Sequence, residues 1–122
     1  EAIAFKRAVR DMMQFPEWDD GVAFVFEGAF YAAAPWPVRN NKYACECFDK
    51  ALAQQPLSSR NQYLRGVAAY DSNDYGTAKL KFEAAMEYKA PCSSSELTQV
   101  DVAAFVLREA KCGLAASINK GA

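Results

Sequence analysis

The stretch of sequence that decides the fold is residues 60–85, which read RNQYLRGVAAYDSNDYGTAKLKFEAA. It ends in the spacing Ala-x3-Phe-x2-Ala, at Ala78, Phe82 and Ala85, and the same spacing begins 34 residues earlier, at Ala44. Self-similarity at a fixed period of this order is typical of proteins built from stacked helical units. The sequence therefore predicts an internal repeat.

A single glycine precedes each copy of this spacing, at Gly28 and Gly66. Two helices approach closely only where small residues meet, because larger side chains push the helix axes apart. We expect the glycine of one helix to face the first alanine of the next helix, with Phe48 or Phe82 filling the space beside the crossing. The second alanine of each spacing leaves room for the following repeat.

The rest of the chain also favours helices. Alanine, the best helix former, is abundant, and the alternation of apolar and polar residues that marks a strand is almost absent. The sequence predicts an all-α fold with helical segments at about residues 1–14, 18–34, 38–54, 58–72, 75–88 and 95–118. The links between them are short and turn-like, so neighbouring helices are expected to form antiparallel hairpins.

The run Tyr63–Tyr70 and the turn at residues 73–75 resemble the tetratricopeptide repeat family, whose period is also 34 residues. The first copy fits less well, since Glu27 stands where the family has leucine and the link that follows is longer. The resemblance implies one α-solenoid domain of antiparallel helix hairpins over residues 1–122. Its parts are a partial repeat helix (1–16), a repeat with an enlarged loop at 35–42 (17–56), a second repeat (57–92) and a C-terminal capping helix (93–122).

The composition limits the possible partners. The net charge is −1 and no window is rich in lysine and arginine, which argues against nucleic acid. The longest apolar runs, Val22–Phe26 and Ala29–Pro35, are too short for a membrane-spanning helix, so we expect no direct insertion into a membrane. The chain begins with Glu1 rather than methionine, so the absence of a targeting signal says little about its compartment.

Catalytic chemistry finds little support in the sequence. The chain contains no histidine, which removes the commonest general base and metal ligand, and its glycines are scattered singly instead of forming a phosphate-binding loop. The acidic pair Asp19 and Asp20 fits the first turn of a helix, where negative charge is favourable, and Glu83 and Glu87 fit a solvated helix face. We therefore expect neither an enzyme nor a cofactor.

The four cysteines do not form the pattern of a metal site. Cys45 and Cys47 lie two positions apart, so on a helix they point to different sides. The repeat geometry places Cys92 and Cys112 too far from them, and from each other, for a disulfide. We expect free thiols and no bound metal, which favours a reducing compartment such as the cytoplasm or an organelle interior.

The family resemblance also implies a site. In tetratricopeptide domains the first helix of each repeat lines a concave groove, which corresponds here to Arg60, Tyr63, Val67, Tyr70 and Asp71 in the second repeat and to Val22, Val25, Ala29 and Ala32 in the first. The alternative is that the aromatic side chains of this face pack against the last helix, which then fills part of the groove. The phenylalanines expected in the core are Phe24, Phe26, Phe30, Phe48, Phe82 and Phe105.

The chemistry of that face indicates the kind of partner. It offers mostly aliphatic side chains and one positive charge, Arg60. Family members that hold acidic chaperone tails use several lysine and asparagine side chains, so that function is not expected, and an amphipathic helix or an extended hydrophobic segment fits better. Trp36, between two prolines, is either a lid on the domain or a further anchor for the partner, with Arg39 and Lys42 as a polar rim.

The sequence therefore predicts a non-catalytic interaction module, or adaptor, that binds a peptide or helix of another protein. The alternative is a structural or assembly subunit of a larger organellar or cytoskeletal complex, since a truncated repeat at residues 1–16 leaves an apolar face that needs a neighbour. The proline-rich insertion and the link at residues 91–96 also resemble the regulator-of-microtubule-dynamics proteins, which are tetratricopeptide-like and associate with microtubules or organelle membranes.

Overall fold

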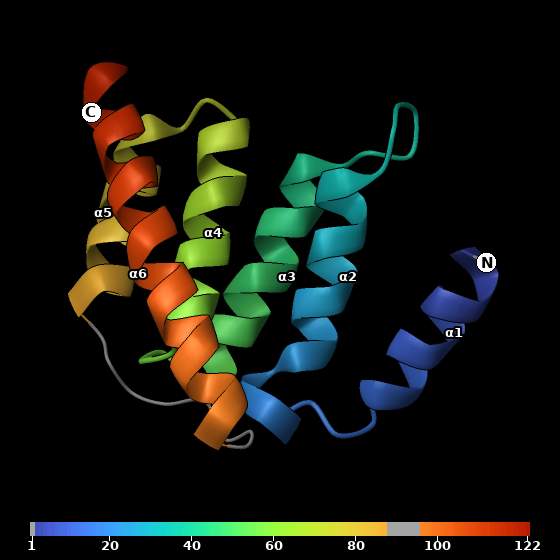
Figure 1. Ribbon diagram of the computed structural model, residues 1–122. Helices are drawn as coiled ribbons and strands as arrows, with labels where there is room; N and C mark the ends of the chain where they lie inside the picture. Colours follow the sequence, from blue (N-terminus) through green and yellow to red (C-terminus); the bar gives the residue numbers. More distant parts are fainter. Residues whose placement is uncertain (1, 88–95) are drawn as a thin grey trace.

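The computed structural model describes residues 2–87 and 96–122, and every regular element in these ranges is helical (Figure 1). The elements are α1 (Ala2–Met12), the short 3-10 helix η1 (Trp18–Asp20), α2 (Val22–Ala33), α3 (Asn41–Gln54), α4 (Ser59–Asp71), α5 (Tyr75–Glu87) and α6 (Glu96–Asn119). The prediction of an all-α chain with about six helices is confirmed.

The helices pack in a repeat-like series. From α2 onward each helix contacts the next one in the chain, and the alternate helices α2, α4 and α6 also contact each other in turn. Helix α1 differs from the others, because α2 is the only described helix that it contacts, and it leans away from the stack in Figure 1.

Glycines lie against phenylalanine rings where neighbouring helices meet, so the predicted place of Phe48 and Phe82 is confirmed, but the atoms nearest to each glycine belong to the ring and not to the alanine expected there. A Cβ atom added at Gly28 would lie 2.8 Å from the ring of Phe48, and one added at Gly66 would lie 2.8 Å from the ring of Phe82. A third glycine shares this role, since a Cβ atom at Gly113 of α6 would lie 2.6 Å from the same Phe82 ring. The Phe82 ring therefore fits between α4 and α6 because neither Gly66 nor Gly113 carries a side chain.

Many of the buried apolar residues form two clusters. The first contains Val25, Ala44, Phe48, Ala51 and Ala68. The second contains Ala69, Ala78, Phe82, Ala85, Val106 and Ala110. Each cluster draws on three successive helices, so burial of apolar surface joins neighbouring units into one continuous stack.

Polar side chains cap the starts of three helices. The side chain of Asn40 accepts a hydrogen bond from the backbone N–H of Tyr43, at 3.0 Å, and caps α3. Ser58 caps α4 in the same way, accepting from the N–H of Asn61 at 3.2 Å. Asp74 accepts from the N–H of Thr77 at the start of α5, and hydrogen bonds from the side chain and backbone of Thr77 lower the pKa of Asp74.

Two predicted helix starts are wrong. Helix α2 begins at Val22 instead of residue 18, because Asp19, Asp20 and Gly21 all adopt left-handed backbone conformations, with φ of 47°, 57° and 79°. Helix α3 begins at Asn41 instead of residue 38, after the Asn40 cap. The enlarged loop between α2 and α3 consequently covers residues 34–40.

Helix α6 packs against both α5 and α4, the position expected of a capping helix. The start predicted for this helix at residue 95 lies outside the described residues, as does Cys92. Although α6 is the longest helix, none of the helices in the described ranges combines the length and the apolar character needed to cross a membrane.

Candidate functional site

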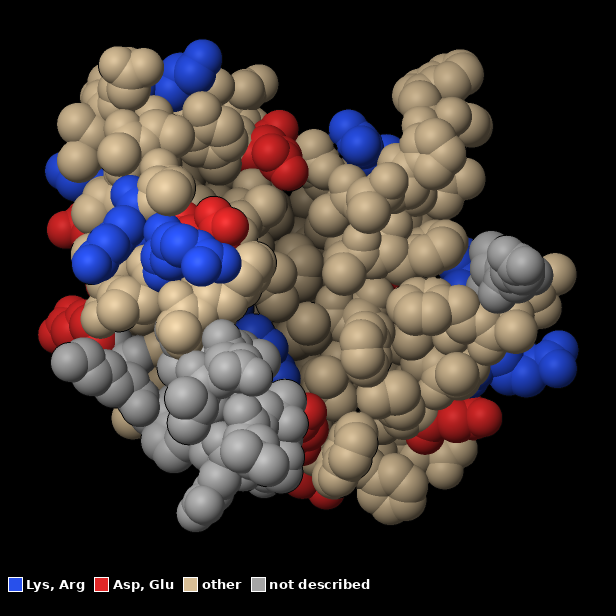
Figure 2. All heavy atoms as spheres, viewed as in Figure 1, with Lys and Arg blue, Asp and Glu red and all other residues tan. Residues whose placement is uncertain are grey.

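The candidate site is the face formed by α2, α4 and α6, which contact one another in turn. We call it the concave face. Figure 2 shows a recessed, mostly uncharged strip between α6 and α2, with acidic and basic side chains along the α6 side. This is the face on which the sequence places the partner-binding residues.

The residues that α2 contributes divide into buried and exposed positions. Val22 and Val25 are each only 8 % exposed, and Val25 belongs to the first core cluster. Ala32 is half-buried against the same cluster, whereas Ala29, one helical turn after Val25, is exposed. Ala29 is therefore the predicted site residue of α2 that a partner could reach most easily.

Arg60 is engaged within the chain. Its guanidinium donates hydrogen bonds to the backbone carbonyls of Asp19, at 2.9 Å, and Asp20, at 3.3 Å, and lies 3.7 Å from the Asp19 carboxylate. The neighbouring Asn61 is fully buried and donates to the Asp20 carbonyl, at 2.8 Å, and to the Ala51 carbonyl, at 3.2 Å. Arg60 and Asn61 thus fasten the left-handed turn at residues 19–21 onto the start of α4.

This contact changes the interpretation of the acidic pair. Asp19 and Asp20 were expected in the first turn of a helix, where they would complement its dipole. They precede α2 instead, in and at the end of the 3-10 turn, and the carboxylate of Asp19 pairs with Arg60. These two residues cannot form the first turn of α2, because residues with a left-handed backbone cannot continue into a right-handed helix.

The aromatic residues of α4 contact other aromatic residues of the stack. Tyr63 is half-buried between Phe82, at 6.0 Å between ring centroids, and Phe105 of α6, at 6.3 Å and nearly perpendicular. Burial, followed by the charges of Glu109 and Cys112, raises the pKa of Tyr63. Through this contact α6 covers the part of the face around Tyr63. This packing against the last helix is the alternative predicted from the sequence.

The other predicted residues of α4 remain closer to solvent. Val67 is half-buried and packs against the second core cluster. Tyr70 is half-buried with its ring 5.1 Å from that of Tyr75, and Asp71 at the end of α4 is exposed. Val67 follows Gly66 as Ala29 follows Gly28, so these two positions are equivalent on α4 and α2.

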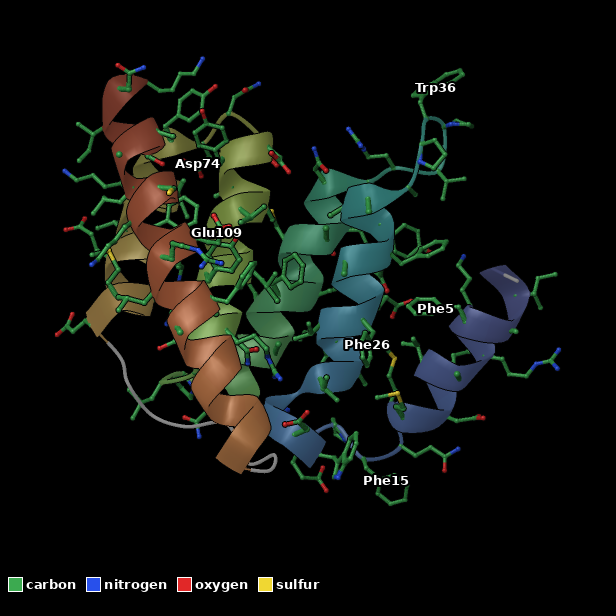
Figure 3. The ribbon with its side chains drawn as sticks, viewed as in Figure 1. Phe5, Phe15, Phe26, Trp36, Asp74 and Glu109 are labelled. Carbon is green, nitrogen blue, oxygen red and sulfur yellow. The ribbon has the colours of Figure 1, made fainter. Side chains whose placement is uncertain are left out.

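Trp36 stands apart from the concave face. It is 88 % exposed, at the tip of the loop between α2 and α3, and Figure 3 shows it pointing away from the helices. It is therefore no lid on the domain. Arg39 does not flank it as a free rim residue, because its side chain donates to the Ala34 carbonyl at 3.1 Å.

Two phenylalanines expected in the core lie at the surface. Phe48 and Phe82 are 2 % exposed, whereas Phe26 is 42 % exposed and Phe105 is 47 % exposed. Helix α2 is apolar on nearly every side, so its periodicity could not distinguish an inward from an outward phenylalanine. Phe105 lies beside Tyr63 and extends the aromatic surface of the concave face onto α6.

The three described cysteines are free thiols, and the described residues contain no group of three or more histidine, cysteine or acidic side chains placed to hold a metal ion. The thiol of Cys45 accepts a hydrogen bond from Arg65 at 3.3 Å. Cys47 is 1 % exposed, and burial together with the nearby Glu27 carboxylate raises its pKa to about 11. Such a thiol is protonated near neutral pH and is a poor nucleophile.

A second surface, around α1, does not figure among the residues that the sequence predicts. Phe15 and Trp18 are 62 % and 60 % exposed and, with Asp11 and Met12, line an open hollow of about 320 Å³. Phe15 is labelled near the base of the molecule in Figure 3. The signal that could have found this surface is the pair of aromatic residues, Phe15 and Trp18, on either side of Pro16 in the segment that follows α1.

Comparisons with known proteins give no relative to set beside this geometry, since no family model, no curated protein and no solved structure matches the chain.

Proposed function

We propose that this chain is an interaction module of the tetratricopeptide type, and that its concave face holds an apolar or amphipathic segment of a partner protein. The observation that carries the proposal is the matched position of Ala29 and Val67, one on each of two equivalent helices, on the face that Phe105 extends onto α6 through its contact with Tyr63. The glycine–phenylalanine contacts at Gly28 and Gly66 support the same spatial register for both helices.

The polar groups at this face favour an apolar ligand. Arg60, its only predicted cation, is held by two carbonyls and a carboxylate of the chain itself. An acidic peptide would have to displace those contacts and would leave the carbonyls of the left-handed turn without that donor. A helix or extended segment with aliphatic side chains requires no such exchange, and its burial is driven by the area removed from water.

The test uses Ala29→Arg, because Ala29 is exposed and its replacement leaves the core clusters intact. The purified wild-type chain and the variant are used to capture partners from an extract of the native cells, and bound proteins are identified by mass spectrometry. We expect the variant to lose a partner that the wild type retains, with at least about a tenfold drop in recovery, since a buried arginine without a counter-charge is costly in an interface.

Leu80→Arg is the matched control. Leu80 is 66 % exposed on α5, which does not contact α2. It should leave the captured partners unchanged. Equal loss with both variants, or no loss with Ala29→Arg, would rule out the concave face as the binding surface.

A structural subunit is the second candidate, and the exposed Phe15 and Trp18 beside their hollow favour it. A subunit whose aromatic surface belongs against a neighbour should self-associate or aggregate when purified alone. Light scattering during size exclusion distinguishes the two functions, because a self-sufficient adaptor is expected to remain monomeric over a wide concentration range.

A further inference from the structure

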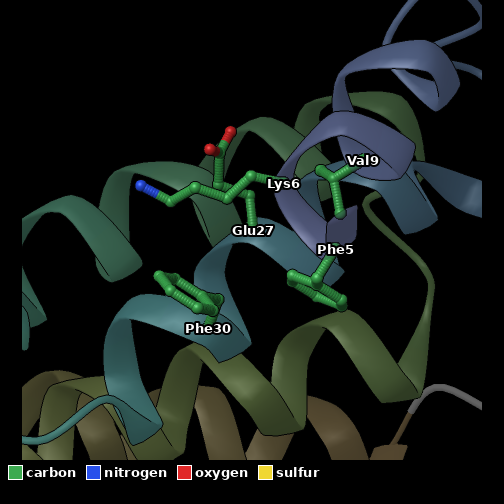
Figure 4. Close-up of a pocket in the computed structure, with 5 residues that line it drawn as sticks. All are labelled: Phe5, Lys6, Val9, Glu27 and Phe30. Atoms are coloured by element: carbon green, nitrogen blue, oxygen red, sulfur yellow. The ribbon is translucent and has the colours of Figure 1, made fainter. Parts of the chain in front are cut away.

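Lys6 of α1 lies in a cage of aromatic side chains from α2. Its ammonium nitrogen is 5.3 Å from the ring centroid of Phe30 and 5.1 Å from that of Tyr31. Figure 4 shows Lys6 extending above Phe30 with Glu27 beside it. A cation over two ring faces is attracted by the negative charge at the centre of each ring.

The cage is built by α2 and α3 without help from α1. The rings of Phe30 and Tyr31 meet nearly at right angles with centroids 5.2 Å apart, and Tyr31 meets Tyr43 of α3 in the same way at 4.9 Å. Glu27 supplies a carboxylate in the same crevice. Burial, Cys47 and this carboxylate together raise the pKa of Tyr43 to about 12.

Helix α1 completes the contact with two apolar side chains. Phe5 stacks on Phe30 at 5.7 Å and meets Phe26 edge-on at 6.3 Å, while Val9 is 3 % exposed. The residues that hold α1 are therefore an aromatic, the cation that follows it, and an apolar residue one turn later. Because Phe5 is still 38 % exposed and α1 contacts no described helix other than α2, the contact is small.

We propose that the surface formed by Phe26, Glu27, Phe30 and Tyr31 is a docking site for a basic amphipathic helix of a partner protein, and that α1 occupies this site within the chain. Charge complementarity carries the choice of occupant. The surface presents two ring faces and one carboxylate, and neither Lys6 nor Glu27 belongs to the two ion pairs found between described residues. A helix with an aromatic residue, a lysine or arginine next to it, and an apolar residue three positions after the cation carries the same side chains that α1 places on this surface, at Phe5, Lys6 and Val9.

The test uses a fluorescent peptide of residues 1–16 as the probe and the full chain as the receptor. The chain's own α1 competes with the peptide, so loosening α1 by Phe5→Ala in the receptor should raise the affinity for the peptide about tenfold. Ile3→Ala in the receptor is the control, since Ile3 lies on the same helix and is 74 % exposed. It should leave the affinity unchanged, and circular dichroism establishes that each variant keeps its helices.

The peptide itself tests the chemistry of the cage. Lys6→Gln in the peptide should weaken binding to the Phe5→Ala chain about fivefold, whereas Lys6→Arg should bind as well as the original, because either cation can lie over the rings. Phe30→Leu in the receptor should weaken binding similarly by removing one ring. Absence of peptide binding to both Phe5→Ala and a second loosened receptor, Val9→Asp, or equal binding of the Lys6→Gln peptide, overturns the proposal.

Two further outcomes distinguish this docking site from a dimer interface and from the concave face. If the wild-type chain forms dimers at rising concentration and the peptide dissociates them, the occupant is α1 of a second copy and not a partner protein, and the proposal is wrong. Ala29→Arg on the concave face should leave peptide binding unchanged. The proposed docking site at the cage and the proposed binding site on the concave face can therefore be confirmed or contradicted independently.

Discussion

Phe82 is the residue on which three helices converge. It belongs to α5, and its ring takes the space left free by Gly66 of α4 and by Gly113 of α6. The ring is 2 % exposed and cannot shorten or turn aside as a flexible aliphatic chain could. The attachment of α6 to the stack thus depends on a missing methyl group at position 113.

We predict that Gly113→Ala destabilises the protein. The new Cβ atom would lie 2.6 Å from the Phe82 ring, and overpacking of this kind costs about 1–3 kcal/mol, less the gain of roughly 1 kcal/mol in helix propensity. Urea unfolding followed by circular dichroism measures the difference. Gly76→Ala is the control, because nothing lies within 4 Å of its added Cβ atom, and an equal loss from both substitutions would contradict this role of Gly113.

Arg60 gives a second prediction at this scale. Arg60→Met should lower the free energy of unfolding by about 1.5–3 kcal/mol, because charge-assisted hydrogen bonds to the Asp19 and Asp20 carbonyls are lost. Arg65→Met is the comparison, since Arg65 pairs with Asp49, whose side chain is 55 % exposed. Because the carboxylate of this pair is open to water, although the Arg65 side chain is only 15 % exposed, the pair should contribute less than about 1 kcal/mol. Similar losses in the two urea titrations would mean that Arg60 does not fasten the turn.

The two contacts differ in how far the sequence could predict them. The spacing of Gly66, Ala78 and Phe82 repeats within the chain, so its packing follows from the period. Gly113 has no copy at that period, so its contact with Phe82 could not be predicted in this way. The carbonyl groups that Arg60 binds lie about 40 residues earlier in the chain, in a left-handed turn that no local sequence pattern predicts. For this reason the sequence places Arg60 among the residues that bind a partner protein.

At the scale of elements, the starts of α4 and α5 agree best with the sequence, whereas α3 begins three residues later than predicted although Asn40 caps it. Ser58 and Asp74 mark the starts of α4 and α5 within one residue of the predicted positions. The predicted start of α2 is wrong because the acidic pair before it has the composition of the first turn of a helix, although its backbone is left-handed. The faces of α2 were also misassigned, at Phe26, because an almost wholly apolar helix carries no periodic signal.

Helix α1 should be the least stable of the helices. Its contacts with α2 are few, and most of its side chains are exposed. We expect amide hydrogen exchange in residues 3–12 to be at least about tenfold faster than in α4, which is packed on several sides, because local opening follows contact density.

Phe5→Ala should speed exchange further in α1 while leaving α4 unchanged, since Phe5 contacts α2 alone among the described aromatic pairs. Protection of α1 equal to that of α4 would show that α1 is a full member of the stack. In that case α1 would not leave the aromatic cage unless the stack of helices also unfolded.

For the whole molecule, alkaline pH should reduce stability in a defined window. The folded chain keeps the Cys47 thiol neutral, with a pKa of about 11 against 9.0 for a free thiol. Since the unfolded state loses this proton first, the contribution of Cys47 is fully present below pH 9 and is lost progressively from pH 9 to about 11. The loss is on the order of 2 kcal/mol. Tyr43, with a pKa of about 12, extends the decline above pH 10.

The measurement is urea unfolding at intervals from pH 7 to 11, compared between the wild type and Cys47→Ala. The variant should lose the part of the decline that belongs to the thiol, and also some of the part due to Tyr43, because Cys47 contributes to the raised pKa of Tyr43. Cys112→Ala is the control, because Cys112 is exposed. Profiles of the same shape for wild type and Cys47→Ala would contradict the burial of this thiol in the native state.

The two tryptophans can serve as fluorescent reporters of where a ligand binds along α2. Trp18 lies just before α2 and Trp36 lies in the loop just after it, and both rings face water, so a helix about 18 Å long separates the two emitters. A ligand that covers only the start of α2 should shift the emission of Trp18, whereas one that runs the length of α2 should shift both. Replacing each tryptophan in turn by phenylalanine would let fluorescence alone report where along α2 a ligand lies.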